Sequence, residues 1–176
     1  MSGRRCALAA LLGLALGGAA AAQGRGRPAI PALAITAPVR LDGRLDEPFW
    51  AASDSLDDFR QREPQAGLPA TERTVVRVAR DAQALYIAIR CTDAQPGAIR
   101  SSQLRRDADL SSDDNVQILI DSFDDRRDAF VFGTNPGGAM WDAQFSGVDD
   151  LNENWNGVWT VAVARDAGGW TAEFRI

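Results

Sequence analysis

Residues 111–142, SSDDNVQILIDSFDDRRDAFVFGTNPGGAMWD, decide the fold class of this chain. Apolar side chains alternate with more polar ones along residues 116–120, a period of two that is typical of a strand with one buried face. Residues 129–133 are apolar on both faces, which predicts a central strand. Residues 139–145 predict a third strand. Three consecutive strands without a helix between them indicate antiparallel β architecture.

Two reversals separate these strands. Residues 124–128 (DDRRD) are too charged for a core and predict a solvated turn. Residues 135–138 (NPGG) provide the proline and glycines that a second reversal requires.

Two further hairpins lie outside this segment. Residues 74–80 (TVVRVAR) and 85–91 (LYIAIRC) are rich in strong β-formers and enclose a short turn. Residues 158–164 and 170–176 form the last pair, and Trp159 and Trp170 are expected in the core. The sequence therefore predicts an all-β chain, an antiparallel β-sandwich of jelly-roll type with one short N-terminal helix.

The N-terminal part divides into three segments. Residues 1–22 combine an arginine-containing start, a short apolar core and an alanine-rich end, the pattern of a cleaved export signal. Residues 23–31 (QGRGRPAIP) predict a flexible leader. The β-sandwich domain is expected to cover residues 32–176, with an edge strand within residues 32–39.

The helix is predicted after the turn LDGRL, with Asp46 as its N-cap and Pro48 in its first turn. Leu45 and Trp50 occupy the positions of a hydrophobic staple, so Trp50 is expected to pack rather than to bind a ligand.

Composition excludes several kinds of chemistry. The chain has no histidine, which removes Ser-His-Asp and Cys-His nucleophiles, histidine bases and histidine-ligated zinc. Its formal charge is −5, and it becomes −7 without Arg4 and Arg5, so nucleic acid is not an expected partner. Without residues 1–22 the chain keeps only Cys91, which lies on an apolar strand face and is expected to be a buried, inert thiol.

Five short segments occur in one order and are specific when taken together. They are LDGRLDEPFW (41–50), LYIAIRC (85–91) followed by Asp93, DDNVQILID (113–121), FGTNPGG (132–138) and GWTAEFRI (169–176). This order resembles carbohydrate-binding module family 9. The resemblance implies an antiparallel β-sandwich that holds the end of a glycan chain, often with bound calcium and often attached to a glycoside hydrolase.

The variant that the chain resembles stands at the N-terminus of large exported bacterial proteins, before a long membrane-associated region. This resemblance implies a location in the periplasm or at the outer membrane. The sequence stops within the strand predicted at residues 170–176, so we expect a longer protein and an unpaired sheet edge at this strand.

Sugar-binding members of the family clamp the terminal sugar between two tryptophan rings. The resemblance places one ring just before the acid pair 113–114, where this chain has Ser111 and Ser112. It places the other ring late in the module, beyond Ile176, and a polar sugar contact at Asn135.

The residues themselves suggest where a sugar binds, because a pyranose offers an apolar face to a ring and hydroxyls to polar side chains. Trp155 lies in the polar loop predicted at 146–157, which favours an exposed ring. Trp141 neighbours Asp142, although a core-facing strand position is equally compatible with Trp141. The predicted carbohydrate-binding residues are Trp155, Trp141, Asn135, Asp142, Asn152 and Asn154.

Calcium is the metal ion that suits this composition, because it takes oxygen ligands. Oxygen-bearing side chains at 150, 152 and 154 recur as at the start of an EF-hand loop, but the required glycine and glutamate are not in place. Asp107, Asp113 and Asp114, with Asp109 nearby, form the candidate calcium site. A solvated acidic loop is the alternative for both groups.

These observations favour a non-catalytic module in polysaccharide binding and carbohydrate catabolism, with a glycan chain and its own downstream membrane-associated region as partners. One alternative is the N-terminal part of a glycoside hydrolase, which needs two carboxylates about 5–10 Å apart. With 24 acidic residues some pair will meet this condition, so we expect any catalysis beyond Ile176. Another alternative is a structural, periplasm-facing domain of an outer-membrane protein without a glycan ligand.

Overall fold

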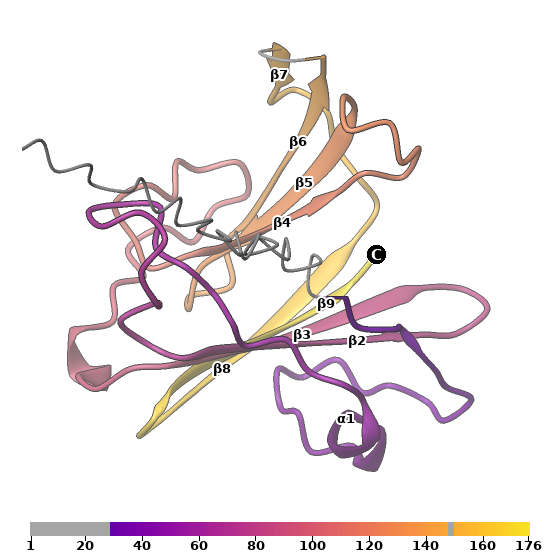
Figure 1. The fold of residues 1–176 in the computed structure, drawn as a ribbon, viewed down its shortest axis with the longest axis horizontal. Coiled ribbons are helices and arrows are strands. Elements are labelled where there is room, and N and C mark those ends of the chain that lie inside the picture. Colours follow the sequence, from indigo (N-terminus) through magenta and orange to yellow (C-terminus); the bar gives the residue numbers. More distant parts are fainter. Residues whose placement is uncertain (1–28, 148–149) are drawn as a thin grey trace, which may run out of the picture.

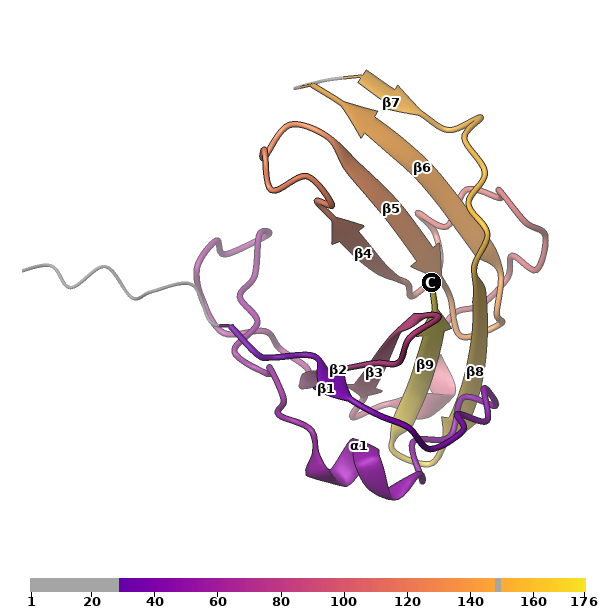
Figure 2. The ribbon, with the colours of Figure 1, turned by 90° about the vertical axis from the view of Figure 1, so that its right-hand side faces the viewer.

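The computed structural model describes residues 29–147 and 150–176. The predicted export signal and residues 23–28 of the predicted leader lie outside these ranges. Two β-sheets face one another, and Figure 2 shows the smaller sheet curving over the larger one (Figures 1 and 2). The predicted β-sandwich is thus confirmed. No helix among the described residues has the length and apolar character needed to cross a membrane.

The larger sheet has the strand order β1-β2-β3-β9-β8 and the smaller sheet the order β4-β5-β6-β7. The strands of the larger sheet are β1 (Leu33–Ala34), β2 (Thr74–Arg80), β3 (Leu85–Thr92), β9 (Gly169–Arg175) and β8 (Thr160–Asp166). Those of the smaller sheet are β4 (Val116–Ile120), β5 (Ala129–Thr134), β6 (Met140–Ser146) and β7 (Asp150–Asn152). All pairs are antiparallel except β1 with β2.

The segment 111–142 forms the meander that its pattern predicts. Strand β5 lies between β4 and β6, and Phe132 is opposite Ile118 on one side and Asp142 on the other. Both flanking hairpins are also confirmed, as β2–β3 and β8–β9.

The main core lies between the sheets. Trp159, which directly precedes β8, contacts Phe132 edge-on at 5.3 Å between ring centroids and stacks on Phe174 at 5.7 Å. Trp159 and Trp170 are only 6% and 4% exposed, which confirms their predicted place in the core. Cys91 packs against this cluster, and burial raises the pKa of its thiol to about 11.

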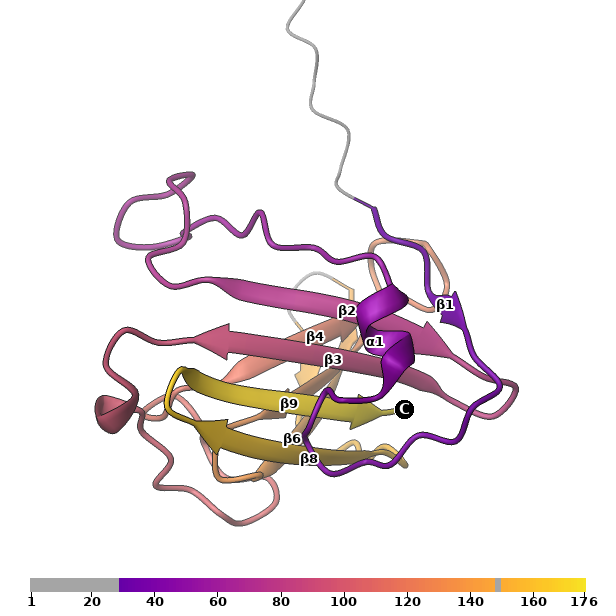
Figure 3. The same ribbon diagram turned by 90° about the horizontal axis from the view of Figure 1, so that it is seen from below.

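Helix α1 (Pro48–Ala52) lies across the outer face of the larger sheet (Figure 3). Trp50 is 1% exposed there, in a second cluster with Tyr86, so its predicted packing role is confirmed. The N-cap is Glu47 and not Asp46, because the helix begins at Pro48, whose fixed φ suits a first helical position. The Glu47 side chain caps nothing and instead accepts the backbone N–H of Arg40.

The edge strand predicted within residues 32–39 is confirmed, and it is the two-residue strand β1 at the edge of the larger sheet. Two other predicted details are wrong. The loop predicted at 146–157 contains the short strand β7, which pairs with β6. Strand β9 is not an unpaired edge, because β3 and β8 flank it on both sides. The predicted domain boundaries stay predictions. A 3₁₀ turn, η1 (Pro96–Ala98), lies in the irregular segment before β4.

Candidate functional site

Asn135 is fully buried at the reversal between β5 and β6. Its amide nitrogen donates to the Gln103 carbonyl and to the Asp113 carboxylate, both at 2.8 Å. Its Oδ1 accepts the backbone N–H groups of Gly137 and Ala139, both at 3.0 Å. Both donors and both acceptor positions are used, so a sugar contact at Asn135 would have to break one of these bonds.

Asp113 connects the start of β4 to the loop before it. Its Oδ1 accepts from the backbone N–H and hydroxyl of Ser102, and its Oδ2 accepts from the N–H of Gln103 and from Asn135. These donors, led by the two backbone N–H groups, hold the pKa of the Asp113 carboxyl well below its usual range. Asp113 is therefore an ionised acceptor that fixes the loop.

The structure does not bring the candidate calcium ligands together. Among the described residues no group of three or more His, Cys, Asp or Glu side chains is placed to hold a metal ion. Asp114 accepts the backbone N–H of Arg100, and Asp107 lies 3.8 Å from Arg106. The oxygens of Asp113 already accept four hydrogen bonds from nitrogen and hydroxyl donors, so the proposed site at Asp107, Asp113 and Asp114 is not formed.

Asp142 is also fully buried, on the inner side of β6. Its two oxygens accept from the guanidinium of Arg106 and from the backbone N–H of Gly157. Arg106 donates in addition to Asn156 Oδ1 at 3.2 Å. This ion pair joins two loops to β6, and it leaves Asp142 directed away from the outer surface.

Trp141 and Trp155, the two tryptophans predicted to bind carbohydrate, lie on opposite faces of the smaller sheet. Asp142 is in register with core-facing Phe132, so its neighbour Trp141 faces outward beside Gly133. The Trp155 ring packs against Phe130 at 4.7 Å and against Phe132 at 6.0 Å, on the inner side. The structure therefore does not bring Trp141 and Trp155, both predicted to bind carbohydrate, to one surface.

Trp155 is half-buried, not the exposed ring that its polar loop predicts. Its immediate surroundings form an apolar cavity of about 240 Å³, lined by Phe130, Phe132, Trp155, Gly157, Val158 and Ile176. Asn152 and Asn154 are exposed in the same loop, where Asn152 Oδ1 accepts the backbone N–H of Asn154. Neither asparagine lines this cavity.

A second cavity, of about 460 Å³, opens on the outer face of the smaller sheet beside Trp141. We call it the Trp141 cavity. It is lined by Asp107, Asp109, Leu110, Ser111, Gln117, Trp141 and Glu153. The Trp141 ring lies over Gly133, where an added Cβ would stand 3.2 Å from the ring. One aromatic ring, an amide, a hydroxyl and three carboxylates thus surround a space of the size that small ligands occupy.

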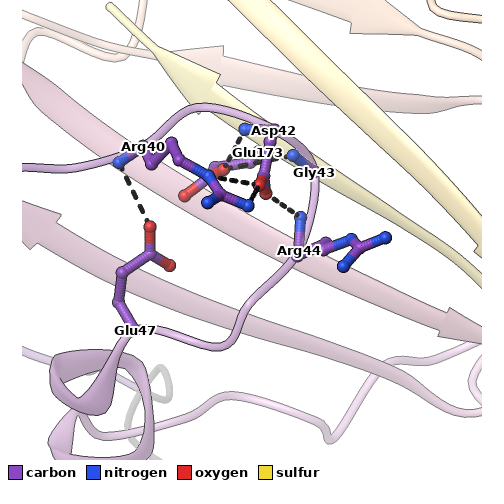
Figure 4. Close-up of polar contacts among 6 residues, drawn as sticks. All are labelled: Arg40, Asp42, Gly43, Arg44, Glu47 and Glu173. Atoms are coloured by element: carbon purple, nitrogen blue, oxygen red, sulfur yellow. Dashed lines mark hydrogen bonds and ion pairs between the residues drawn. The ribbon is translucent and has the colours of Figure 1, made fainter.

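Glu173 is a buried polar residue that its alternating strand pattern does not reveal. It lies on the outer face of β9, fully buried, and accepts from the N–H groups of Asp42 and Gly43 at 3.3 Å (Figure 4). It also accepts from Trp50 Nε1 at 3.2 Å. Burial, and secondly the charge of Glu47, raise the pKa of the Glu173 carboxyl to about 7.

The contacts of Glu173 join the first and last of the five characteristic segments. Asp42, Gly43 and Trp50 belong to LDGRLDEPFW, and Glu173 belongs to GWTAEFRI. Gly43 has φ +77° and approaches β8 so closely that an added Cβ would stand 2.5 Å from the backbone of Val163. This cluster holds the N-terminal segment on the larger sheet and lies on different elements from the Trp141 cavity.

Comparison with models of known protein families gives a match over residues 41–176, to the family described as carbohydrate family 9 binding domain-like. The chain belongs to this family. The match covers all five segments on which the resemblance rests. Comparison with curated proteins gives no match.

Comparison with solved structures supports the family 9 fold. A carbohydrate binding module family 9 (CBM9) from Caldicellulosiruptor kristjanssonii, in complex with cellotriose, is similar with a TM-score of 0.56 and 18% sequence identity. The alignment covers 82% of this chain and 65% of that module, so the chain spans about two thirds of its length. At this identity the likeness concerns the fold alone.

Proposed function

We propose that this family 9 domain binds a glycan chain without cleaving it, and that the sugar stacks on Trp141. The observation that carries this proposal is the outward-facing indole at the wall of the Trp141 cavity. The apolar face of a pyranose can cover such a ring. At the same cavity the carboxylates can accept hydrogen bonds from sugar hydroxyls, and Gln117 can both accept and donate them.

Two further observations support the same surface. Ser111, where the family resemblance implies one of the clamping rings, lines the Trp141 cavity. In this chain the ring comes instead from Trp141 on β6. The similar family 9 module holds cellotriose, which supports a β-linked glucose oligosaccharide as the first ligand to test.

Calorimetric titration with cello-oligosaccharides tests the proposal. Trp141→Ala should weaken binding about tenfold or more, because loss of stacked apolar area at about 25 cal/mol per Å² readily amounts to 1.4 kcal/mol. The matched control is Leu119→Ala, which removes a 61% exposed side chain from the outer face of β4, outside the Trp141 cavity.

The control should bind as the parent does, and both variants should keep the parent's melting temperature within a few degrees. Unchanged affinity of the folded Trp141→Ala protein for every bound oligosaccharide would overturn the assignment of this site.

The wider role is also a proposal. The export-signal pattern of residues 1–22 supports action outside the cytoplasm, in the periplasm or at the outer membrane. There the domain would hold polysaccharide during carbohydrate catabolism, with a downstream membrane-associated region of the same protein as a second partner.

A further inference from the structure

The side chains that line the Trp141 cavity carry negative charge and no positive charge. Three of the seven described lining residues are acidic, and none is a cation. Nε of Arg106 lies 3.8 Å from Asp107, but it donates to Asn156 Oδ1, and a second guanidinium nitrogen of Arg106 donates to Asp142. The guanidinium of Arg106 thereby balances part of the negative charge of Asp107.

The negative charges of the other two carboxylates at this cavity have no cation beside them among the described residues. Asp109 and Glu153 form no ion pair with any described residue. Asp109 accepts the backbone N–H of Ser111 at 2.8 Å, and this hydrogen bond lowers the pKa of the Asp109 carboxyl. Asp109 therefore stays ionised in mildly acidic solution, and the cavity keeps a negative wall.

We infer that the Trp141 cavity selects glycans by charge, taking chains of unacetylated amino sugars in preference to neutral chains and rejecting chains of uronic acids. This inference rests on the proposed function, because it assumes that sugars enter the cavity. A protonated sugar amine can donate charge-assisted hydrogen bonds to Asp109 and Glu153, whereas a uronate carboxylate meets like charge there.

The size of the effect follows from the exposure of the carboxylates. An exposed ion pair changes an equilibrium by about 1.4-fold to fivefold, so two pairs give about twofold to twenty-fivefold tighter binding. The effect should weaken at high salt, since the Debye length falls to about 3 Å at 1 M. The formal charge of −5 adds a weak attraction of the same sign at low salt.

Titration of the whole chain with oligosaccharides of equal length tests the inference. The probes are glucosamine, N-acetylglucosamine, glucose and galacturonate oligomers, at about pH 5, where the sugar amine is protonated. At low salt the glucosamine oligomer should bind about twofold to twenty-fivefold more tightly than its N-acetylated counterpart, and the galacturonate oligomer should bind more weakly than both neutral oligomers.

The double variant Asp109→Asn/Glu153→Gln should lose this preference, because its binding of the glucosamine oligomer should weaken more than its binding of the neutral oligomers. The control Glu63→Gln/Glu72→Gln removes the same charge from exposed positions before β2 and should keep the preference. Equal binding of charged and neutral oligomers by the parent, or an unchanged preference in the double variant, overturns the charge selection alone. Failure of every oligomer to bind overturns the proposed function instead.

Discussion

Replacing the buried Glu173 with glutamine should remove a pH-dependent loss of stability. The fold raises the pKa of this carboxyl from its ordinary 4.5 to about 7, so the unfolded chain ionises at a lower pH than the folded chain. Stability from this group is fully present below pH 4.5 and is lost as the pH rises through 7. At about 1.4 kcal/mol for each of 2.5 pH units, the loss is at most about 3 kcal/mol.

Glutamine keeps the shape of the side chain, and its amide oxygen can accept from Trp50 or Gly43 in place of a carboxylate oxygen. Glu173→Gln should therefore be more stable than the parent by up to about 3 kcal/mol at pH 8 and within about 1 kcal/mol of it at pH 4.5. Urea unfolding at both pH values measures the difference.

The exposed control Glu72→Gln should match the parent at both pH values. If Glu173→Gln changed the unfolding free energy equally at pH 4.5 and pH 8, the carboxyl would have an ordinary pKa in the fold. Burial and the charge of Glu47 would then not raise the pKa of Glu173, contrary to our expectation.

Three further outcomes follow from the structure and the sequence. Trp170→Ala should cost about 3–5 kcal/mol of stability because Trp170 lies in the core, and Trp155→Ala about 1–3 kcal/mol because Trp155 packs half-buried on Phe130. Denaturant unfolding measures both values, and a Trp155→Ala variant as stable as the parent would contradict that packing. The thiol of Cys91 should react roughly a hundredfold more slowly with a disulfide reagent at pH 8 in the native chain than in denaturant; equal rates would show an accessible thiolate. Mass spectrometry of exported protein should find a chain that begins at Gln23, and an intact N-terminus on such material would refute the export signal.

The strands could be predicted from sequence because their signals are local. Alternation along residues 116–120 and 170–176 reflects burial of one face against the other sheet, and the glycine-rich and acidic turns mark where each strand ends. The resemblance to carbohydrate-binding module family 9 predicts the same β-sandwich. Local signals do not predict every strand. The residues around 150–152 have no strand pattern, because β7 forms there only by pairing with β6.

The candidate site is harder to predict from sequence, because residue type alone indicates a surface position for polar side chains. Asn135 and Asp142 are buried, and the groups that satisfy them come from residues 103, 106 and 113, which approach only in the folded chain. Trp155 was expected to be exposed because its own loop is polar, but its ring covers phenylalanines of β5. The strand period alone could have placed Trp141 on the outer face, since Phe132 identifies the inner one.

The indole N–H signals of the five tryptophans test most directly whether a sugar stacks on Trp141. In a ¹⁵N-labelled chain titrated with cellotriose or with the tightest amino-sugar oligomer, the Trp141 signal should shift with ligand concentration. The signals of buried Trp50, Trp159 and Trp170 should stay in place. Saturable binding that shifts Trp155 and leaves Trp141 unmoved would place the sugar on the other face of the sheet and contradict the proposed site.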